Sequence, residues 1–278
     1  MSDEDMSVQE DLEEPSGMPR TFGRVMRRFR VLAGMERAEL GARTGYSEST
    51  IASFEQGRRI PPPAFIVRVD EVLGARGVLA EMTEDLERAQ YPVFFQSAAA
   101  LERKAVGLHV FAVQAAPGLL QTKDYAEAVF TSRRPALDAE TVEQRVTARL
   151  ARRAIFERKP APTISFVLEE SILRRRLGGR AVLRGQLERI LLVGQGHNVE
   201  IQVMPDACEE HAALSGPFTL IETTKGRRIA YVEAHRHSHL FTDRSTVREL
   251  EDQYGVLRAQ ALSPRESLAL VEKLLGET

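Results

Sequence analysis

Two glycines and a serine, placed four and two residues apart, constrain the fold of this chain more than any other feature. Gly41 is small enough to lie where two helices touch, and Gly45 tolerates the left-handed backbone of a tight turn. Ser47 can then cap the amides of a helix that begins at Glu48. Apolar residues that would fix the crossing of the two helices are Leu40, Ile51 and Phe54. The spacing predicts a helix-turn-helix.

The segments on either side of this turn are also helical in pattern. Apolar residues recur at steps of three and four over residues 21–33, which is typical of an amphipathic helix with Thr21 as its cap. We expect the remaining helices of this region at residues 37–44, 48–56 and 64–73, followed by a connecting helix at 78–89.

The rest of the chain mixes strand and helix patterns. Runs of β-branched or alternating residues predict strands at residues 106–113, 163–168, 199–204, 218–221 and 228–232. Helical periodicity predicts helices at residues 139–156, 182–193, 245–258 and 264–275. Because the two kinds of segment interleave irregularly, we expect an α+β fold here and not a doubly wound sheet.

Charge is distributed unevenly along the chain. Residues 1–17 hold seven acidic residues and no Lys or Arg, a composition that predicts a disordered tail. Residues 18–77 hold eleven Arg against six acidic residues, a net charge of +5, although the whole chain carries −2. A basic segment in an otherwise neutral chain is typical of a DNA-binding module. We therefore expect an acidic tail at 1–17, an all-α helix-turn-helix domain at 18–77 and an α+β domain at 78–278.

Several classes of protein are disfavoured by what the sequence lacks. The single cysteine, Cys208, excludes an internal disulfide and a cysteine-based zinc finger. No apolar run approaches the roughly 20 residues that span a bilayer, and the start of the chain is acidic where a secretory signal would be basic. There is no Gly-x-Ser-x-Gly elbow and no Walker lysine. We therefore expect a cytoplasmic protein with no membrane association, no catalytic activity and no cofactor.

Further residues complete a family pattern around the predicted turn. They are Arg30, Leu40, Gly45-Tyr46-Ser47, Ile51, Glu55-x-Gly57-Arg58 and the prolines that follow. With this pattern, over about 55 residues, the chain resembles the Xre-type family of phage-repressor-like regulators. The resemblance implies a sequence-specific transcription regulator that binds a duplex DNA operator as a homodimer.

The resemblance also implies a role for each matching position. Residues expected to face base edges in the major groove are Glu48, Ser49, Thr50 and Ser53. Residues expected to contact phosphates are Arg37, Ser47, Arg58 and Arg59. Arg30 and Glu55 match a partly buried, structural ion pair.

Two positions depart from the family pattern. Arg37 replaces the usual Gln, which should strengthen phosphate binding and its dependence on salt. Glu48 puts a carboxylate at a base-reading position, where it repels phosphate and can accept a hydrogen bond from cytosine.

The C-terminal part of the chain carries a second resemblance. Its motifs are APGLLQT at 116–122, DYA at 124–126, LSGPF at 214–218 and ALSPRESL at 261–268. These are similar to the C-terminal domain of a large group of actinobacterial regulators that are described as antitoxin-like. The likeness covers nearly all of residues 80–275 and implies a small protein partner from a neighbouring gene. In one interpretation this domain dimerises and senses a partner or ligand. In the alternative, partner binding is the main function and DNA binding is autoregulatory.

A cluster of histidines leaves one more alternative open. His235, His237 and His239 alternate and would share one face of a strand, and His211 with Cys208 could complete a metal site. An exposed polar strand end explains the same cluster without a metal. We therefore expect no metal, and a zinc site with metal-dependent enzyme activity is the less favoured alternative.

Overall fold

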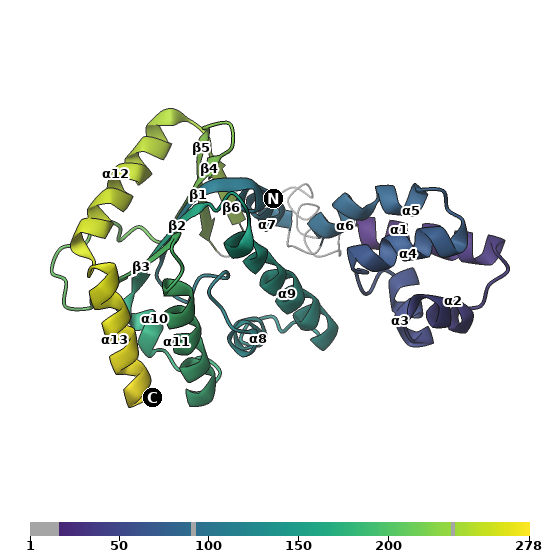
Figure 1. Cartoon of the computed structure of the whole chain (residues 1–278), viewed down its shortest axis with the longest axis horizontal. Helices are drawn as coiled ribbons and strands as arrows, with labels where there is room; N and C mark the ends of the chain where they lie inside the picture. Colours follow the sequence, from purple (N-terminus) through teal and green to yellow (C-terminus); the bar gives the residue numbers. More distant parts are fainter. Residues whose placement is uncertain (1–16, 90–92, 235–236) are drawn as a thin grey trace, which may run out of the picture. The chain divides into compact units, whose positions relative to one another are not determined.

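The computed structural model describes residues 17–89, 93–234 and 237–278. The chain divides into two compact units, Met1–Gln96 and Ser97–Thr278. Helices make up the regular structure of the first unit over the described residues, whereas the second is built around a six-stranded sheet (Figure 1). The predicted fold class, a helical helix-turn-helix region followed by an α+β domain, is confirmed.

The N-terminal unit follows the predicted order of helices with two differences. Its helices are α1 (Gly17–Leu32), α2 (Arg37–Thr44), α3 (Glu48–Glu55), α4 (Pro63–Leu73), α5 (Val78–Glu81) and α6 (Thr83–Ala89). Helix α1 begins at Gly17, four residues earlier than predicted, so Thr21 is not its cap. The Thr21 hydroxyl donates instead to the Gly17 carbonyl at 2.8 Å, inside the helix. The connecting helix predicted at 78–89 is present as two helices, α5 and α6.

The core of this unit joins all six helices. Its fully or almost fully buried side chains are Phe22, Met26, Leu40, Ile51, Phe54, Phe65, Ile66, Val69, Leu79 and Leu86. The Phe54 and Phe65 rings lie 4.7 Å apart between centroids, and Tyr46 packs edge-on against both. The Asp70 carboxylate accepts hydrogen bonds from the amides of Gly77 and Leu79 and so holds the start of α5 against α4. Leu79 and Leu86 therefore belong to the core of the N-terminal unit.

The helix-turn-helix depends on two glycines with different functions. A Cβ added to Gly41 would lie 2.4 Å from the Tyr46 carbonyl oxygen, so only glycine allows α2 this close to the turn. Gly45 has φ of 83°, in the left-handed region that favours glycine. Ser47 accepts a hydrogen bond from the Thr50 amide at 3.2 Å and caps α3, as the sequence predicted.

The C-terminal unit contains more elements than the sequence predicted. It comprises α7 (Val93–Lys104), which begins before the boundary between the units, β1 (Ala105–Ala112), α8 (Lys123–Thr131), α9 (Ala139–Ala151), the 3-10 helix η1 (Arg152–Glu157), β2 (Thr163–Glu169), α10 (Glu170–Arg174), α11 (Arg180–Gly194), β3 (Val199–Met204), β4 (Phe218–Thr223), β5 (Arg228–Ala234), β6 (His237–Phe241), α12 (Arg244–Gln260) and α13 (Pro264–Glu277). Helices α7, α8 and α10 and strand β6 were not predicted. The helix predicted at 139–156 ends at Ala151, where the backbone tightens into η1.

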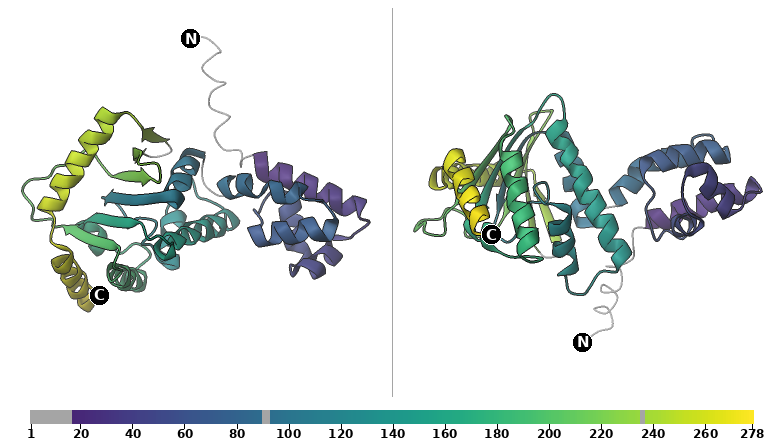
Figure 2. Two further views of the ribbon diagram at one scale, coloured as in Figure 1. Left: turned by 45° about the horizontal axis from the view of Figure 1, so that its top comes forward. Right: turned by 60° about the horizontal axis from the view of Figure 1, so that its bottom comes forward.

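The sheet is mixed, with strand order β3-β2-β1-β4-β5-β6. Strands β1, β2 and β3 run parallel, and β4, β5 and β6 continue the sheet in antiparallel pairs. The parallel strands are connected through helices. A tight hairpin reverses the chain and can join only antiparallel strands, so a parallel pair needs a longer crossover connection. This arrangement places helices on both faces of the sheet (Figure 2).

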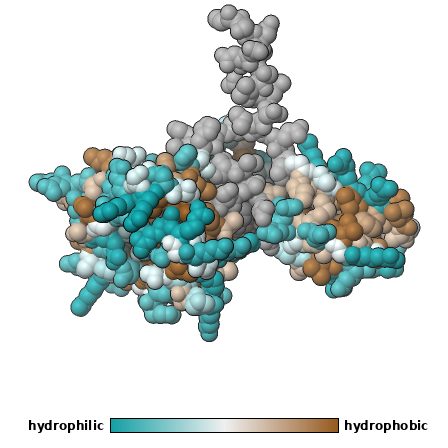
Figure 3. Space-filling model, turned by 90° about the horizontal axis from the view of Figure 1, so that it is seen from above, coloured by the Kyte–Doolittle hydropathy of each residue, from teal (hydrophilic) through white to brown (hydrophobic). Residues whose placement is uncertain are grey.

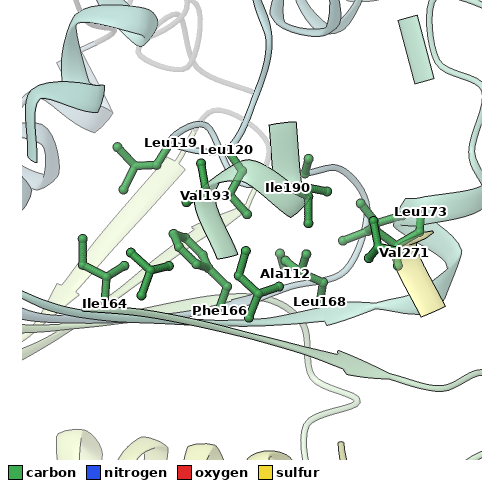
Figure 4. Close-up of a cluster of buried hydrophobic side chains, with 14 of the residues drawn as sticks. Ala112, Leu119, Leu120, Ile164, Phe166, Leu168, Leu173, Ile190, Val193 and Val271 are labelled. Atoms are coloured by element: carbon green, nitrogen blue, oxygen red, sulfur yellow. The ribbon is translucent and has the colours of Figure 1, made fainter. Parts of the chain in front are cut away.

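Alternation along the strands divides the core into two layers. Ile164, Phe166 and Leu168 of β2 point toward α11 and α13, with Leu119 and Leu120 packed above them (Figure 4). On the other face, Phe111, Val167 and Phe218 of the sheet pack against Val247, Tyr254 and Leu257 of α12. Because both faces are covered, the central strands are almost continuously apolar, which is why the sequence identified them as strands.

The outer surface carries both polar and apolar residues. Hydrophilic residues cover much of the C-terminal unit in the view of Figure 3. No helix of the described segments has the length and apolar character needed to cross a membrane.

Replacing Gly41 tests the close contact inside the helix-turn-helix. We expect Gly41→Ala to lower the free energy of unfolding of the N-terminal unit by about 2–3 kcal/mol, because the new methyl group overlaps the Tyr46 carbonyl. Native-state hydrogen exchange measures this loss for each unit separately. The matched control is Gly185→Ala in α11, where an added Cβ has open space. The control should stabilise its own unit by about 0.5–1 kcal/mol. Equal effects of the two substitutions would contradict the close contact.

Candidate nucleic-acid interface

Helix α3 has one buried face and one exposed face. Ile51, Phe54 and Glu55 are buried, whereas Glu48 and Ser49 are exposed at the start of the helix. Thr50 and Ser53 are partly exposed. The four residues predicted to read bases are thus all accessible at least in part, and a groove-binding helix needs such an outward face at its N-terminal end.

The Ser47 hydroxyl organises the first turn of α3. Besides the Thr50 amide, it contacts the Ser49 hydroxyl at 2.9 Å and the Thr50 hydroxyl at 2.8 Å. These bonds orient two predicted base-reading side chains toward the cap. Ser47, predicted as a phosphate contact, is engaged in capping here, and its role toward DNA stays a prediction.

A single buried carboxylate joins the first three helices. Glu55, at the end of α3, has 1% of its side chain exposed and accepts from Arg30 Nε at 2.5 Å. The same carboxylate accepts from Arg37 Nε at 2.8 Å. Arg30 also donates to the Met35 carbonyl at 2.7 Å, which fixes the connection between α1 and α2. The structure therefore pairs Arg30 with Glu55 and adds Arg37 to the pair.

Arg37 lies at the start of α2 with 32% of its side chain exposed. The hydrogen bond and charge of Glu55 raise the pKa of its guanidinium, and the charges of Glu48 and Glu36 add to this effect. Its Nε is used by Glu55, but within the described residues its terminal nitrogens form no hydrogen bond. The Nε side of the guanidinium is thus held by Glu55, while its terminal nitrogens keep their N–H donors, and its contact with phosphate stays a prediction. An arginine fixed in this way loses less conformational entropy on binding than a free one.

Arg58 and Arg59 follow α3 directly after Gly57. Their amides donate to the Ser53 carbonyl at 3.0 and 3.3 Å, so the turn after the helix places both residues at its end. Gly57 has φ of 68°, and an added Cβ would lie 2.6 Å from the Arg20 amide nitrogen. The N-terminal part of α1 therefore packs against this turn.

The sequence reasoning missed two residues beside this surface. Gln56 is exposed at the end of α3, at the helical spacing that continues from Ser49 and Ser53. That spacing was a signal that could have identified it. Arg20 was missed because it comes near Arg58 only through the close packing of α1 on Gly57. No local sequence pattern predicts that packing.

The metal-binding alternative receives no support from the described residues. No three His, Cys, Asp or Glu side chains come together as a metal cluster among them. His211 Nε2 pairs with the Glu169 carboxylate at 2.7 Å, and Cys208 Sγ contacts the Glu210 carbonyl at 2.9 Å. His235 lies outside the described residues, so the complete histidine cluster stays untested.

Removing the charge of Glu55 tests the buried network. We expect Glu55→Gln to cost about 3–5 kcal/mol of the stability of the N-terminal unit, because the buried Arg30 then has no counter-charge. The control is Glu39→Gln, which removes an exposed pair with Arg43 and should cost no more than about 0.5 kcal/mol. Hydrogen exchange of α1 and α3 would measure both. A similar small cost for the two variants would show that Glu55 does not hold the helices.

Comparison with known families agrees with the two-unit architecture. Residues 21–82 match a family model described as a helix-turn-helix domain, which assigns DNA binding to the N-terminal unit. Residues 95–273 match a family model described as a domain of unknown function (DUF5753). No curated protein and no solved structure matches the chain. Because the second match covers more than half of the chain, the protein belongs to the DUF5753 family, with a helix-turn-helix domain at its N-terminus.

Proposed function

We propose that this protein is an Xre-type, sequence-specific transcription regulator that reads duplex DNA with the outward face of α3. One observation carries the proposal: Glu48 and Ser49 are exposed at the N-terminal end of α3, beside an arginine whose terminal nitrogens are available for phosphate. The buried Glu55 network fixes the helix that presents them. Phosphate contacts would set the register on DNA, and the α3 side chains would select the bases.

The proposed regulator acts as a homodimer. One two-turn recognition helix reads only a few base pairs, so affinity must come from paired half-sites about 34 Å apart. In this proposal the C-terminal unit dimerises and senses a protein partner or ligand without catalysing a reaction. The resemblance of this unit to antitoxin-like domains favours a small protein as its partner. A protein that regulates transcription in this way acts in the cytoplasm.

Arg37 and Glu48 should affect DNA binding in different ways. We expect Arg37→Ala to weaken binding to all DNA sequences and to reduce the slope of log K against log salt by about one unit, because one phosphate contact is lost. Fluorescence anisotropy at several salt concentrations measures the slope. The control is Arg184→Ala in α11, which removes an exposed pair with Glu188 and should leave DNA binding unchanged.

Glu48→Ala, in the same experiment, should change the ranking of operator variants and not the overall affinity. Each base pair that Glu48 selects is expected to shift by about 1–3 kcal/mol. If Glu48→Ala weakened every sequence equally, the residue would not read bases. An unchanged salt slope in Arg37→Ala would remove Arg37 from the interface.

A fragment tests whether dimer contacts lie in the C-terminal unit. We expect residues 17–89 to fold alone, because this fragment retains Leu79 and Leu86, and to bind an operator about 10²–10⁴-fold more weakly than the full chain. A fragment ending at residue 77 lacks both leucines and should be less stable. Analytical ultracentrifugation and binding titrations would compare them. If the full chain were a monomer, or if the fragment bound as tightly as the parent, the C-terminal unit would not be the dimerisation unit. Its remaining role would then be partner binding, which is the antitoxin-like alternative.

A further inference from the structure

A group of arginines in the C-terminal unit lies beside the loop between β1 and α8. The group, called the arginine cluster below, consists of Arg145 and Arg149 of α9, Arg152 and Arg153 of η1, and Arg189 of α11. Three of them, Arg149, Arg152 and Arg153, contact the loop, and Arg145 and Arg189 are close enough to act on the charges of Arg149 and Arg153. All five side chains are partly buried. Neither the helix-turn-helix nor the proposed reading of DNA makes use of them.

Gln121 is the point where two of these arginines meet. Its side chain is almost fully buried, and Arg149 Nη1 donates to its Oε1 at 2.7 Å. Arg153 Nη2 donates to its main-chain carbonyl. The guanidinium of Arg149 also lies over the Phe130 ring, 4.1 Å from its centroid, which holds it in place by a cation–π contact. The cluster is therefore ordered by the fold.

Most of the arginines in the cluster have no direct ion pair within the described residues. Arg152 is satisfied by Glu102 through two bonds of 2.7 and 2.6 Å. Among the described residues, the other four form no ion pair with a carboxylate. Each guanidinium has five N–H donors, yet Arg149 and Arg153 each form one hydrogen bond to Gln121, and Arg145 and Arg189 form none with the described chain.

Two of the unused donors are buried. Arg153 Nε and Arg189 Nε are shielded from solvent and have no hydrogen-bond partner in the structure. Buried polar atoms without a partner are uncommon in folded proteins, and each one requires an explanation such as a bound ion. An acceptor bound beside these two neighbouring arginines would satisfy both atoms.

The lowered pKa values of two arginines in the cluster also favour a bound anion. Desolvation, reinforced by the charge of Arg152, lowers the pKa of Arg149 to about 9, and the charge of Glu233 only partly offsets this. Desolvation and the nearby Arg189 lower the pKa of Arg153. Unpaired buried charge is costly, and a bound anion would remove that cost.

The loop itself does not require these charges. A neutral donor could satisfy the Gln121 amide and carbonyl, because both are uncharged acceptors. Gln186 already does so for the neighbouring residues, donating to the Leu120 carbonyl and accepting from the Thr122 amide, each at 2.9 Å. Arginine at four positions thus exceeds what holding the loop demands.

We propose that the arginine cluster is a binding site for a phosphate-bearing small molecule. Phosphate has three acceptor oxygens and close to two negative charges at neutral pH, which suits several guanidinium groups better than a single carboxylate does. The arginines are partly buried, so a small molecule reaches them more readily than a DNA backbone, which needs exposed cations. The binding of a phosphate compound by the arginine cluster does not depend on the proposed function. The further idea that this compound is an effector of DNA binding rests on the proposed function.

Isothermal titration of the full chain with pyrophosphate and with inorganic phosphate, at constant ionic strength, tests the site without DNA. We expect Arg149→Gln and Arg153→Gln each to weaken binding by about tenfold or more, as for the loss of one charge-assisted hydrogen bond. Arg145→Gln is a further variant that removes charge but no hydrogen bond within the described chain, so it should fold and still bind more weakly. Arg184→Gln, on the exposed face of α11, is the control and should bind as the parent does.

Three results would overturn the proposal. The parent chain could give no binding heat beyond that of sodium chloride at equal ionic strength. Cluster variants could bind pyrophosphate as tightly as the parent, which would place the anion on another basic surface. Finally, the cluster variants could weaken binding of duplex DNA while Arg37→Ala did not, and DNA would then be the occupant. If pyrophosphate binds through the cluster but leaves operator affinity unchanged, the site stands and its effector role fails.

Discussion

The N-terminal unit depends on one buried carboxylate, that of Glu55. Its two oxygens accept from Arg30 and Arg37, which come from the two helices that precede the turn. The carboxylate is nearly inaccessible to water, so removing its charge leaves the buried Arg30 without a counter-charge. The same network that stabilises the helix-turn-helix also orients Arg37 beside the exposed start of α3. Stability and the proposed recognition of DNA therefore share one interaction, and Arg37 has a structural role in addition to its predicted contact with phosphate.

The C-terminal unit uses charge in the opposite way. Its sheet is covered by helices on both faces, and the loop at 116–122 is held by buried amides of Gln121 and Gln186. Arg149 and Arg153 contact that loop, with Arg189 near Arg153, and within the described residues none of the three forms an ion pair with a carboxylate. In the N-terminal unit the protein supplies its own counter-charge, whereas in the arginine cluster an external anion would supply it. A regulator can couple a ligand to its fold in this way, because a bound anion stabilises only the state that assembles the cluster.

Local patterns predicted most of the elements, and long-range packing accounts for the rest. Helix α2 and strand β3 have the predicted bounds because their glycines, caps and β-branched runs are local signals. Helix α8 was missed although Thr122 caps it, since its motif was interpreted only as a family likeness. The start of α1 depends on packing against Gly57, and the bond from Arg37 to Glu55 joins residues 18 positions apart. No periodicity in the sequence encodes such contacts. The family resemblance implied the ion pair of Arg30 with Glu55, whereas the bond from Arg37 to the same carboxylate was not predicted.

The central claim is that the outward face of α3 selects DNA sequences. Genome-wide mapping of the sites bound by the full-length protein, compared with those bound by its Glu48→Ala variant, tests it most directly. The account predicts a shared inverted-repeat motif with half-sites about one helical turn apart, and a changed base preference within each half-site for the variant. Enrichment without a common motif, or an identical motif for both proteins, would contradict the claim that Glu48 on α3 reads the operator.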